Sequence, residues 1–219
     1  MEDFIKSVAQ QLRKPEGEMG IEIGERMNKG NYEMNKNTIQ LLAPAAGDNI
    51  LEIGMGNGHF IKEITGADPS VRYTGCDYSE LMVKEAIERN KEEVASGRVN
   101  IQHGTANALP FPDNSFNKIF TVNTVYFWED PAKELAEISR VLQPAGKLFL
   151  AFRSEDCMKH IPFAQHNFTL YTRERLSELL TTNGFRIEGI IENKEPSQEM
   201  HGEPMPMDHI LITASTTNF

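Results

Sequence analysis

The fold is decided by the stretch ILEIGMGNGHF at residues 50–60. It contains a short apolar run that ends in an acid, then three glycines at alternate positions, then the predicted start of a helix. Glycine lets the backbone adopt positive φ and leaves no Cβ against a ligand, and the first helical turn has free N–H groups. In parallel α/β sheets, such a strand–loop–helix turn is where nucleotides bind. The stretch therefore predicts a site for an adenosine-containing cofactor.

Three glycine-rich patterns compete for this loop. A phosphate-binding loop needs Gly-x-x-x-x-Gly-Lys-Ser/Thr, and the chain has no such run. In the dinucleotide pattern Gly-x-Gly-x-x-Gly, the third glycine would fall on His59, whose side chain prevents close packing of helix on strand. The third pattern, Glu-x-Gly-x-Gly-x-Gly, is filled by Glu52, Gly54, Gly56 and Gly58. It resembles motif I of the class I S-adenosylmethionine-dependent methyltransferases.

A second strand that ends in an acid follows the glycine loop. Residues 71–76 predict a strand, and Asp77 comes about 20 residues after the loop, where an acid accepts hydrogen bonds from ribose hydroxyls. Tyr78 follows directly and is expected to lie against adenine. Ser79 is a suitable N-cap for a helix over 80–89. A solvated turn acid is the commoner role of such an aspartate, but its register with the glycine loop favours ribose binding.

The segment HGTANALPFPDNSFN at residues 103–117 carries the most family-specific resemblance. It is similar to the Gly-Asp-Ala-x-x-Leu-Pro-Phe stretch of small-molecule methyltransferases, the group that includes quinone- and sterol-methylating enzymes. In that group the aspartate faces the amino group of adenine, and the next backbone N–H faces a ring nitrogen. Here these positions are Thr105, an uncharged hydroxyl, and Ala106, with Asn107 bordering the same site. Asn117 replaces the aspartate that ends the family's pattern.

The resemblance continues beyond the predicted fourth strand. A helix that begins at Pro131 is followed by a Pro-Ala-Gly turn, similar to the Leu-Lys-Pro-Gly-Gly turn of the same family. Asn123 lacks the prolines of Asn-Pro-Pro-Tyr, the signature of enzymes that methylate planar amino groups of bases. The resemblance covers residues 38–155 well. It implies S-adenosyl-L-methionine as cofactor, S-adenosyl-L-homocysteine as product and a small molecule as methyl acceptor.

The order of elements predicts an α/β fold, a Rossmann-like, doubly wound, seven-stranded and mostly parallel sheet with a C-terminal antiparallel hairpin. Thr172 is the expected N-cap of the last helix, and a loop with three prolines is expected over 196–207. The predicted strands lie near 49–53, 71–76, 98–103, 118–123, 146–152, 185–192 and 208–215. The predicted helices lie near 58–66, 79–90, 131–142 and 172–183.

Two regions lie outside the motifs. Residues 1–40 are expected to form an N-terminal helical lid, as such segments often do in class I methyltransferases, and residues 41–219 the methyltransferase domain. Tyr32 and Asn28 are the candidates for the face of the lid that covers the cofactor. A substrate-side insertion is expected near 154–171, because insertions at the carboxyl ends of strands line the ligand crevice.

The resemblance assigns the cofactor contacts to the ends of the predicted strands. Because the sulfonium methyl is already activated, the protein mainly has to align the acceptor with it. Asn123 and Tyr126 are expected near the methyl group, and His166 is the candidate general base where the acceptor must lose a proton. The expected cofactor-binding residues are Glu52, Gly54, Met55, Gly56, Gly58, Asp77, Tyr78, Thr105, Ala106, Asn107 and Asn123.

Composition argues against several other classes of protein. The 22 Lys and Arg residues are outnumbered by 32 Asp and Glu, and the net charge of −10 disfavours a nucleic-acid substrate. The six histidines and two cysteines have no metal-binding spacing, so no metal is predicted. There is no apolar run of the roughly 20 residues that a membrane span needs. The N-terminus lacks an apolar secretory segment, which favours a cytoplasmic location, and the lid's apolar content suits a homodimer.

Two other functions stay open from the sequence. The same fold could serve as a non-catalytic S-adenosylmethionine-binding or regulatory subunit. Thr105 and Asn117, which stand where the family has aspartates, slightly favour this alternative. A nicotinamide-dependent oxidoreductase is disfavoured by His59 and by the Leu-Pro-Phe run at 109–111. These motifs do not specify the acceptor, or whether its carbon, nitrogen or oxygen is methylated.

Overall fold

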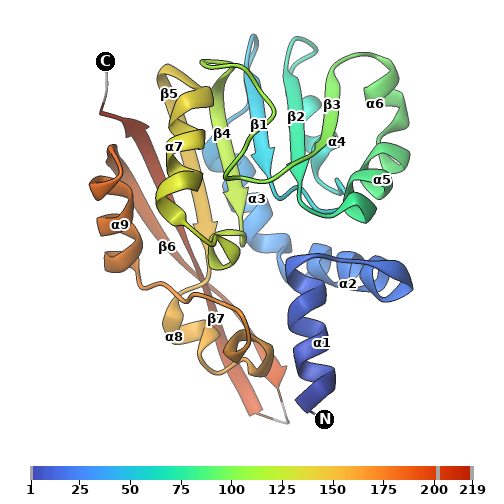
Figure 1. The fold of residues 1–219 in the computed structure, drawn as a ribbon, viewed down its shortest axis with the longest axis vertical. Helices are drawn as coiled ribbons and strands as arrows, with labels where there is room; N and C mark the ends of the chain where they lie inside the picture. The colour runs from blue at the N-terminus through green and yellow to red at the C-terminus, as the bar shows by residue number, and fades with distance from the viewer. Residues whose placement is uncertain (1, 201–202, 218–219) are drawn as a thin grey trace.

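The computed structural model describes residues 2–200 and 203–217, which form a single sheet covered by helices on both faces (Figure 1). Its strands are β1 (Asn49–Ile53), β2 (Arg72–Asp77), β3 (Val99–His103), β4 (Phe116–Val122), β5 (Leu142–Phe152), β6 (Phe185–Met200) and β7 (Glu203–Thr216). Its α-helices are α1 (Glu2–Arg13), α2 (Gly17–Gly30), α3 (Tyr32–Leu42), α4 (Ile61–Thr65), α5 (Glu80–Arg89), α6 (Lys91–Ala95), α7 (Pro131–Val141), α8 (Glu155–Met158) and α9 (Arg173–Thr182). The 3-10 turns η1 (Val125–Phe127) and η2 (Pro162–Gln165) complete it.

The seven strands follow the order β3-β2-β1-β4-β5-β7-β6. Neighbours from β3 to β5 are parallel, and β7 runs antiparallel to both β5 and β6. This topology confirms the predicted doubly wound sheet with a C-terminal antiparallel hairpin. Because β1, β2 and β4 run in the same direction, the loops after their last residues meet at one edge of the sheet.

The apolar core lies in two layers, one against each face of the sheet. One layer joins the sheet to α7 and α9, through Leu135, Ile138 and Leu176. The other joins it to α3 and α4, through Met34 and Ile61. The helical spacing that predicted the 131–142 helix therefore identified the buried face of α7 correctly, since all its apolar members are enclosed.

The C-terminal hairpin is much longer than predicted. Most of the loop expected over 196–207 is strand, because β6 runs to Met200 and β7 begins at Glu203; residues 201–202 lie outside the described chain. Prolines are tolerated there because β5 pairs β7 over residues 210–214, which leaves the distal part of β7 with one free edge. Pro196 falls in the register shift between Glu195 and Gln198.

The N-terminal segment, for which the sequence predicted a helical lid, contains the three helices α1, α2 and α3. Two of the glycines in α2 serve close packing. A Cβ on Gly20 would lie 2.8 Å from Cδ2 of Leu81, and one on Gly24 would lie 3.3 Å from Met82, so both glycines let α2 approach α5. The predicted N-caps are confirmed: the hydroxyls of Ser79 and Thr172 accept bonds from the third residue of each helix.

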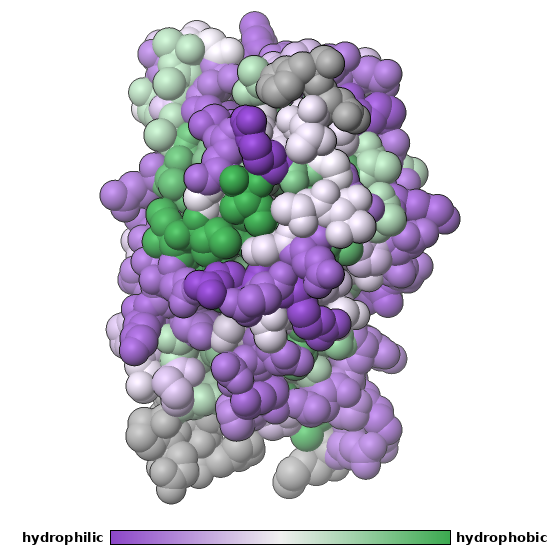
Figure 2. Space-filling view, turned by 90° about the vertical axis from the view of Figure 1, so that its left-hand side faces the viewer, coloured by the Kyte–Doolittle hydropathy of each residue, from purple (hydrophilic) through white to green (hydrophobic). Residues whose placement is uncertain are grey.

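Strand β6 forms an edge of the sheet. Figure 2 shows the side of the molecule on which this edge lies, with hydrophobic side chains gathered in a patch among hydrophilic ones. Ile190 and Ile191 of β6 are exposed large hydrophobic residues, while Glu188 pairs with Lys147 at 2.9 Å. Within the described ranges, no helix is long and apolar enough to span a membrane.

Candidate active site

A cavity of about 590 Å³ lies at the carboxyl ends of the parallel strands. Its wall has three parts: the loops that follow the strands, helices α1 and α2, and the segment 154–171 together with β7. The segments predicted as lid and as substrate-side insertion therefore border the same space as the glycine loop. That the first of these segments covers the cofactor and the second contacts the substrate remains a prediction.

The glycine loop adopts the backbone conformation that its sequence demands. Gly54, Gly56 and Gly58 have φ values of +78°, +57° and +69°. A Cβ on Gly54 would lie 2.2 Å from Cγ2 of Thr124, and one on Gly58 would lie 3.0 Å from Cβ of Ala86. A Cβ on Gly56 would have no protein atom within 4 Å. Two of these glycines thus permit close packing, and the middle one faces the open cavity.

Asp77 closes the glycine loop onto the end of β2. One carboxylate oxygen accepts a hydrogen bond from Gly56 N at 2.9 Å, and the other accepts one from Ser79 N at 2.9 Å. Burial raises the pKa of Asp77 to about 6, although these two bonds and the charge of His103 act in the opposite direction. Asp77 lines the cavity, so its remaining lone pairs are placed to accept hydrogen bonds from a ligand.

Glu52 is the second acid in the cavity wall. Only 5% of it is exposed, and the Tyr73 hydroxyl donates to its Oε2 at 2.5 Å. Burial raises the pKa of Glu52 to about 7; the bond from Tyr73 opposes this, and the charge of Asp77 adds to it. A cation in the cavity would favour the ionised form of both acids.

The predicted adenine-binding residues line one part of the cavity together. Tyr78 is 43% exposed, with Lys14 Nζ 5.2 Å from the centre of its ring. Thr105 stands where the family has an aspartate, and its hydroxyl donates to Asn107 Oδ1 at 2.7 Å. The proton of this hydroxyl is therefore already used within the protein. Ala106 follows, as predicted for a backbone contact, and all four residues are among those that line the cavity.

Asn123 and Tyr126 meet at the end of β4. Asn123, predicted as the last residue of a strand, instead lies just beyond β4 with a φ of +56°, and its Nδ2 donates to Asn31 Oδ1 at 2.8 Å. The Tyr126 hydroxyl donates to Asn123 Oδ1 at 3.0 Å and accepts from Arg153 N. Burial raises the pKa of Tyr126 far above its usual range, although the Arg153 contacts oppose it. Tyr126 therefore positions Asn123 and is not a base at neutral pH.

The structure does not bring every predicted residue to the cavity. His166 is absent from the wall, which is formed in its segment by Phe163 and Phe168 instead. Tyr32 also lies outside the wall and packs near Phe60, with ring centres 6.1 Å apart. The geometry therefore argues against His166 as a general base and against Tyr32 as the cover of the cofactor. Asn28, the other lid candidate, does line the cavity.

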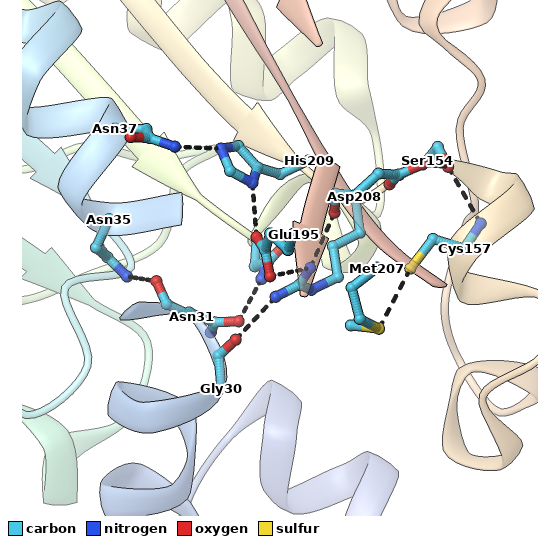
Figure 3. Close-up of polar contacts among 12 residues, drawn as sticks. Gly30, Asn31, Asn35, Asn37, Ser154, Cys157, Glu195, Met207, Asp208 and His209 are labelled. Atoms are coloured by element: carbon cyan, nitrogen blue, oxygen red, sulfur yellow. Dashed lines mark hydrogen bonds and ion pairs between the residues drawn. The ribbon is translucent and has the colours of Figure 1, made fainter. Parts of the chain in front are cut away.

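A buried polar network beside the cavity was not predicted (Figure 3). Arg153, at the end of β5, donates to Gly30 O at 2.8 Å and pairs with Glu195 at 3.1 Å. Glu195 also accepts from His209 Nδ1 at 2.6 Å, and Asn37 Nδ2 lies 3.1 Å from His209 Nε2. These contacts join the α2–α3 junction to β5, β6 and β7. Burial raises the pKa of Glu195, but His209 and Arg153 together hold it below its ordinary value.

A second feature missed from the sequence is Glu134 in the first turn of α7. An acid in the first turn of a helix is normally exposed to solvent, where it interacts favourably with the helix dipole. Glu134 is instead only 3% exposed and lines the cavity. Trp128 lies in the same wall. The place of Glu134 on the apolar face of α7, four residues before Ile138 and seven before Val141, is the sequence signal that could have drawn attention to this acid. Among the described residues, no group of three or more His, Cys, Asp or Glu could hold a metal ion.

The fold and the acidic, glycine-lined strand ends define a class I methyltransferase. The family model described as a methyltransferase domain matches residues 51–150. The chain is 31% identical over 133 residues to the uncharacterized methyltransferase YdaC of Bacillus subtilis, covering 61% of this chain and 71% of that protein. This chain belongs to the small-molecule group of the S-adenosylmethionine-dependent methyltransferase family, and it is a methyltransferase.

Two further likenesses agree with this assignment. The demethylmenaquinone methyltransferase of Listeria welshimeri is 32% identical over 155 residues, covering 68% of this chain and 64% of that protein. A SAM-dependent methyltransferase from Aquifex aeolicus has a similar structure, with a TM-score of 0.64 and 20% identity over 81% of this chain and 88% of that one. This chain thus spans less than two thirds of the Listeria protein. The likeness to the Aquifex structure shows the fold alone.

Proposed function

We propose that this protein binds S-adenosyl-L-methionine at the glycine-loop end of the cavity and transfers its methyl group to a small molecule bound at the other end. One observation carries the proposal: Gly56, with positive φ and open space before it, is hydrogen-bonded to the carboxylate of Asp77. Loop and acid thus form one unit at the strand edge where α/β sheets bind nucleotides.

The residues of this end fit the proposed cofactor. The open space before Gly56 would admit its methionine part beside Met55, and the buried acid Glu52 suits its amino group. Asp77 has free lone pairs for the ribose hydroxyls. The exposed ring of Tyr78 and the backbone of Ala106 suit the face and edge of adenine.

The protein's part in the reaction is to bind, orient and exclude water. When bound, S-adenosylmethionine supplies a methyl group on a sulfonium sulfur that is already activated for displacement. Asn123, fixed by Asn31 and Tyr126, borders the space where the acceptor would meet that group. Holding two reactants in attack geometry is worth about 7–11 kcal/mol at most. The proposal assigns no general base among the residues of this chain.

The test is calorimetric titration with S-adenosylmethionine of the wild type and of Asp77→Ala. We expect the variant to bind more weakly by about 1–3 kcal/mol, because the ribose hydroxyls lose their hydrogen bonds to the Asp77 carboxylate. Asp68→Ala is the matched control, because Asp68 is an aspartate at the opposite edge of the sheet that bonds Ser70 and does not line the cavity. S-adenosylhomocysteine should bind as well, and a reduced nicotinamide should not.

The outcomes separate the competing functions. Absence of heat and of any thermal shift with both sulfur nucleosides, for protein purified free of cofactor, contradicts the proposal. Binding of S-adenosylhomocysteine without product on a broad panel of acceptors would favour a non-catalytic subunit. Homodimer formation, which the exposed isoleucines of β6 support, is tested by light scattering, and the predicted cytoplasmic location by cell fractionation.

A further inference from the structure

The carboxyl group of Glu134 is a buried acid to which the proposed cofactor contacts assign no role; burial raises its pKa, although nearby backbone N–H groups oppose this. It is 3% exposed, it lines the cavity, and its Oε2 has no hydrogen-bond partner among the described residues. Buried polar atoms are almost always bonded, so an orphan carboxylate oxygen in a cavity wall calls for a ligand. The helix N-terminus alone does not account for it, since an exposed acid there would serve equally well.

The other charged side chains in the cavity wall have partners. Three cations of the wall are paired with acids, and its other acids accept hydrogen bonds from protein donors. The pairs are Arg13 with Glu129, Arg26 with Glu22, Arg153 with Glu195, Glu52 with Tyr73 and Asp77 with the N–H groups of Gly56 and Ser79. Within the described ranges, Glu134 takes part in no ion pair. It is therefore the carboxylate of the wall left for a cation.

Glu134 lies on the acceptor side of the cavity. It belongs to α7, the helix that follows Trp128. Burial raises the pKa of Tyr171 in the segment 154–171; the charge of Arg175 opposes this rise, and the charge of Glu134 adds to it. The start of α7 therefore lies near the segment 154–171.

Aromatic rings surround this side of the cavity. Phe168 packs against Tyr126 and Phe127, with ring centres 5.8 and 4.6 Å away, and all three line the cavity together with Trp128. Aromatic faces attract organic cations, and a buried carboxylate adds a charge-assisted hydrogen bond. A neutral apolar acceptor would be served by the rings alone and would leave Glu134 without a partner.

We propose that the methyl acceptor carries a positively charged amino or ammonium group, which Glu134 and the rings of Trp128, Tyr126, Phe127 and Phe168 bind in this cavity. The inference rests on the proposed methyltransferase function and names its substrate class. Glu134 determines specificity: it selects which molecules are placed before the methyl group, and no proton transfer is assigned to it.

The experiment compares 2-phenylethylamine with 2-phenylethanol, two probes of similar shape that differ in charge at neutral pH. Binding is followed by the fluorescence of Trp128, the single tryptophan of the chain, with and without S-adenosylhomocysteine. For the wild type we expect the amine to bind about 10- to 100-fold more tightly than the alcohol. Glu134→Gln should abolish this preference. Asp130→Asn, which removes an acid at the same helix end outside the cavity wall, should preserve it.

Equal affinity of the two probes for the wild type, including no detectable binding of either, overturns the inference. An amine preference that survives in Glu134→Gln also overturns it. If Glu134→Gln does not fold, Glu134→Leu takes its place, and a preference retained by that variant again contradicts the inference. The probes are titrated without cofactor as well, so a failure of S-adenosylmethionine binding counts against the proposed function and not against the cation site.

Discussion

The two ends of the cavity are built in different ways. At the glycine-loop end, Gly54, Gly56 and Asp77 lie within one strand–loop–helix unit and its neighbouring strand, joined by a bond of 2.9 Å. At the other end, Arg153, Glu195 and residues of α2 and β7 come from four distant segments. A local unit leaves a pattern in the sequence, whereas an assembly of distant segments leaves none. The contrast explains why the cofactor is easier to infer than the acceptor.

The largest effect is expected from Gly54→Val, which breaks the glycine-loop end. A side chain at φ +78° is strained by about 1–2 kcal/mol, and its Cβ would lie 2.2 Å from Thr124 Cγ2. We expect loss of detectable S-adenosylmethionine binding by calorimetry and a lower midpoint of urea unfolding. Gly189→Ala is the control, because a Cβ there meets no atom within 4 Å. Undiminished binding in Gly54→Val would show that this loop does not hold the cofactor.

The next effect tests the distant assembly at the other end. Arg153→Leu leaves the carboxylate of Glu195, on a side chain 7% exposed, with one partner fewer. Removing one member of a buried ion pair costs about 3–5 kcal/mol of unfolding free energy. Chemical denaturation measures it, and Lys133→Leu, which removes a surface pair at 3.4 Å, should change it by about 0–1 kcal/mol. Equal losses in the two variants would mean that the network adds no more than a surface pair.

The free energy of unfolding is expected to depend on pH through Glu52, a buried acid of the glycine-loop end. The pKa of Glu52 is about 7 in the folded chain against 4.5 ordinarily, so the native state binds more protons between these values. Stability from Glu52 is therefore fully present below pH 4.5 and is lost as pH rises through 7. At about 1.4 kcal/mol per unit of pKa, the loss is about 3–4 kcal/mol. Urea unfolding of Glu52→Gln from pH 4.5 to 8 should show a smaller decline than the wild type, and an equal decline would contradict the assignment.

The smallest effect concerns the contact between the α2–α3 junction and the end of β4. Asn31→Ala removes the bond from Asn123 Nδ2 to Asn31 Oδ1 at 2.8 Å, which is worth about 0.5–1.5 kcal/mol. We expect faster release of S-adenosylhomocysteine in stopped-flow experiments, with little change in the unfolding midpoint. Glu33→Ala, an exposed change in the first turn of α3, should leave the release rate unaltered. An unchanged or slower release in Asn31→Ala would show that this bond does not retain the ligand.

The sequence predicted what adjacent residues determine. The five parallel strands, the N-caps Ser79 and Thr172, and the apolar face of α7 follow from local pattern and were confirmed. Two features depended on partners far away in the chain and were missed. The helix α2 contains glycines because α5 lies against them, and the hairpin tolerates prolines because its distal part has a free edge.

The same distinction holds for the candidate site. The acids Glu52 and Asp77 and the glycines Gly54 and Gly56 line the cavity as predicted, because their spacing is short and the strands are parallel. Gly58 does not line it and instead packs against Ala86. His166 was chosen for its residue type in a loop, with no geometric information, and the loop turns Phe163 and Phe168 to the cavity instead. Arg153 and Glu195 are 42 residues apart in the chain, so no local pattern could join them.

The central claim, a cavity with one cofactor end and one separate acceptor end, is tested by a crossed titration. S-adenosylhomocysteine and 2-phenylethylamine are each titrated into the wild type, Asp77→Ala and Glu134→Gln. We predict that Asp77→Ala weakens binding of the nucleoside alone, and that Glu134→Gln weakens binding of the amine alone. Loss of both ligands in either single variant, with folding intact by circular dichroism, would contradict the division of the cavity into two independent ends.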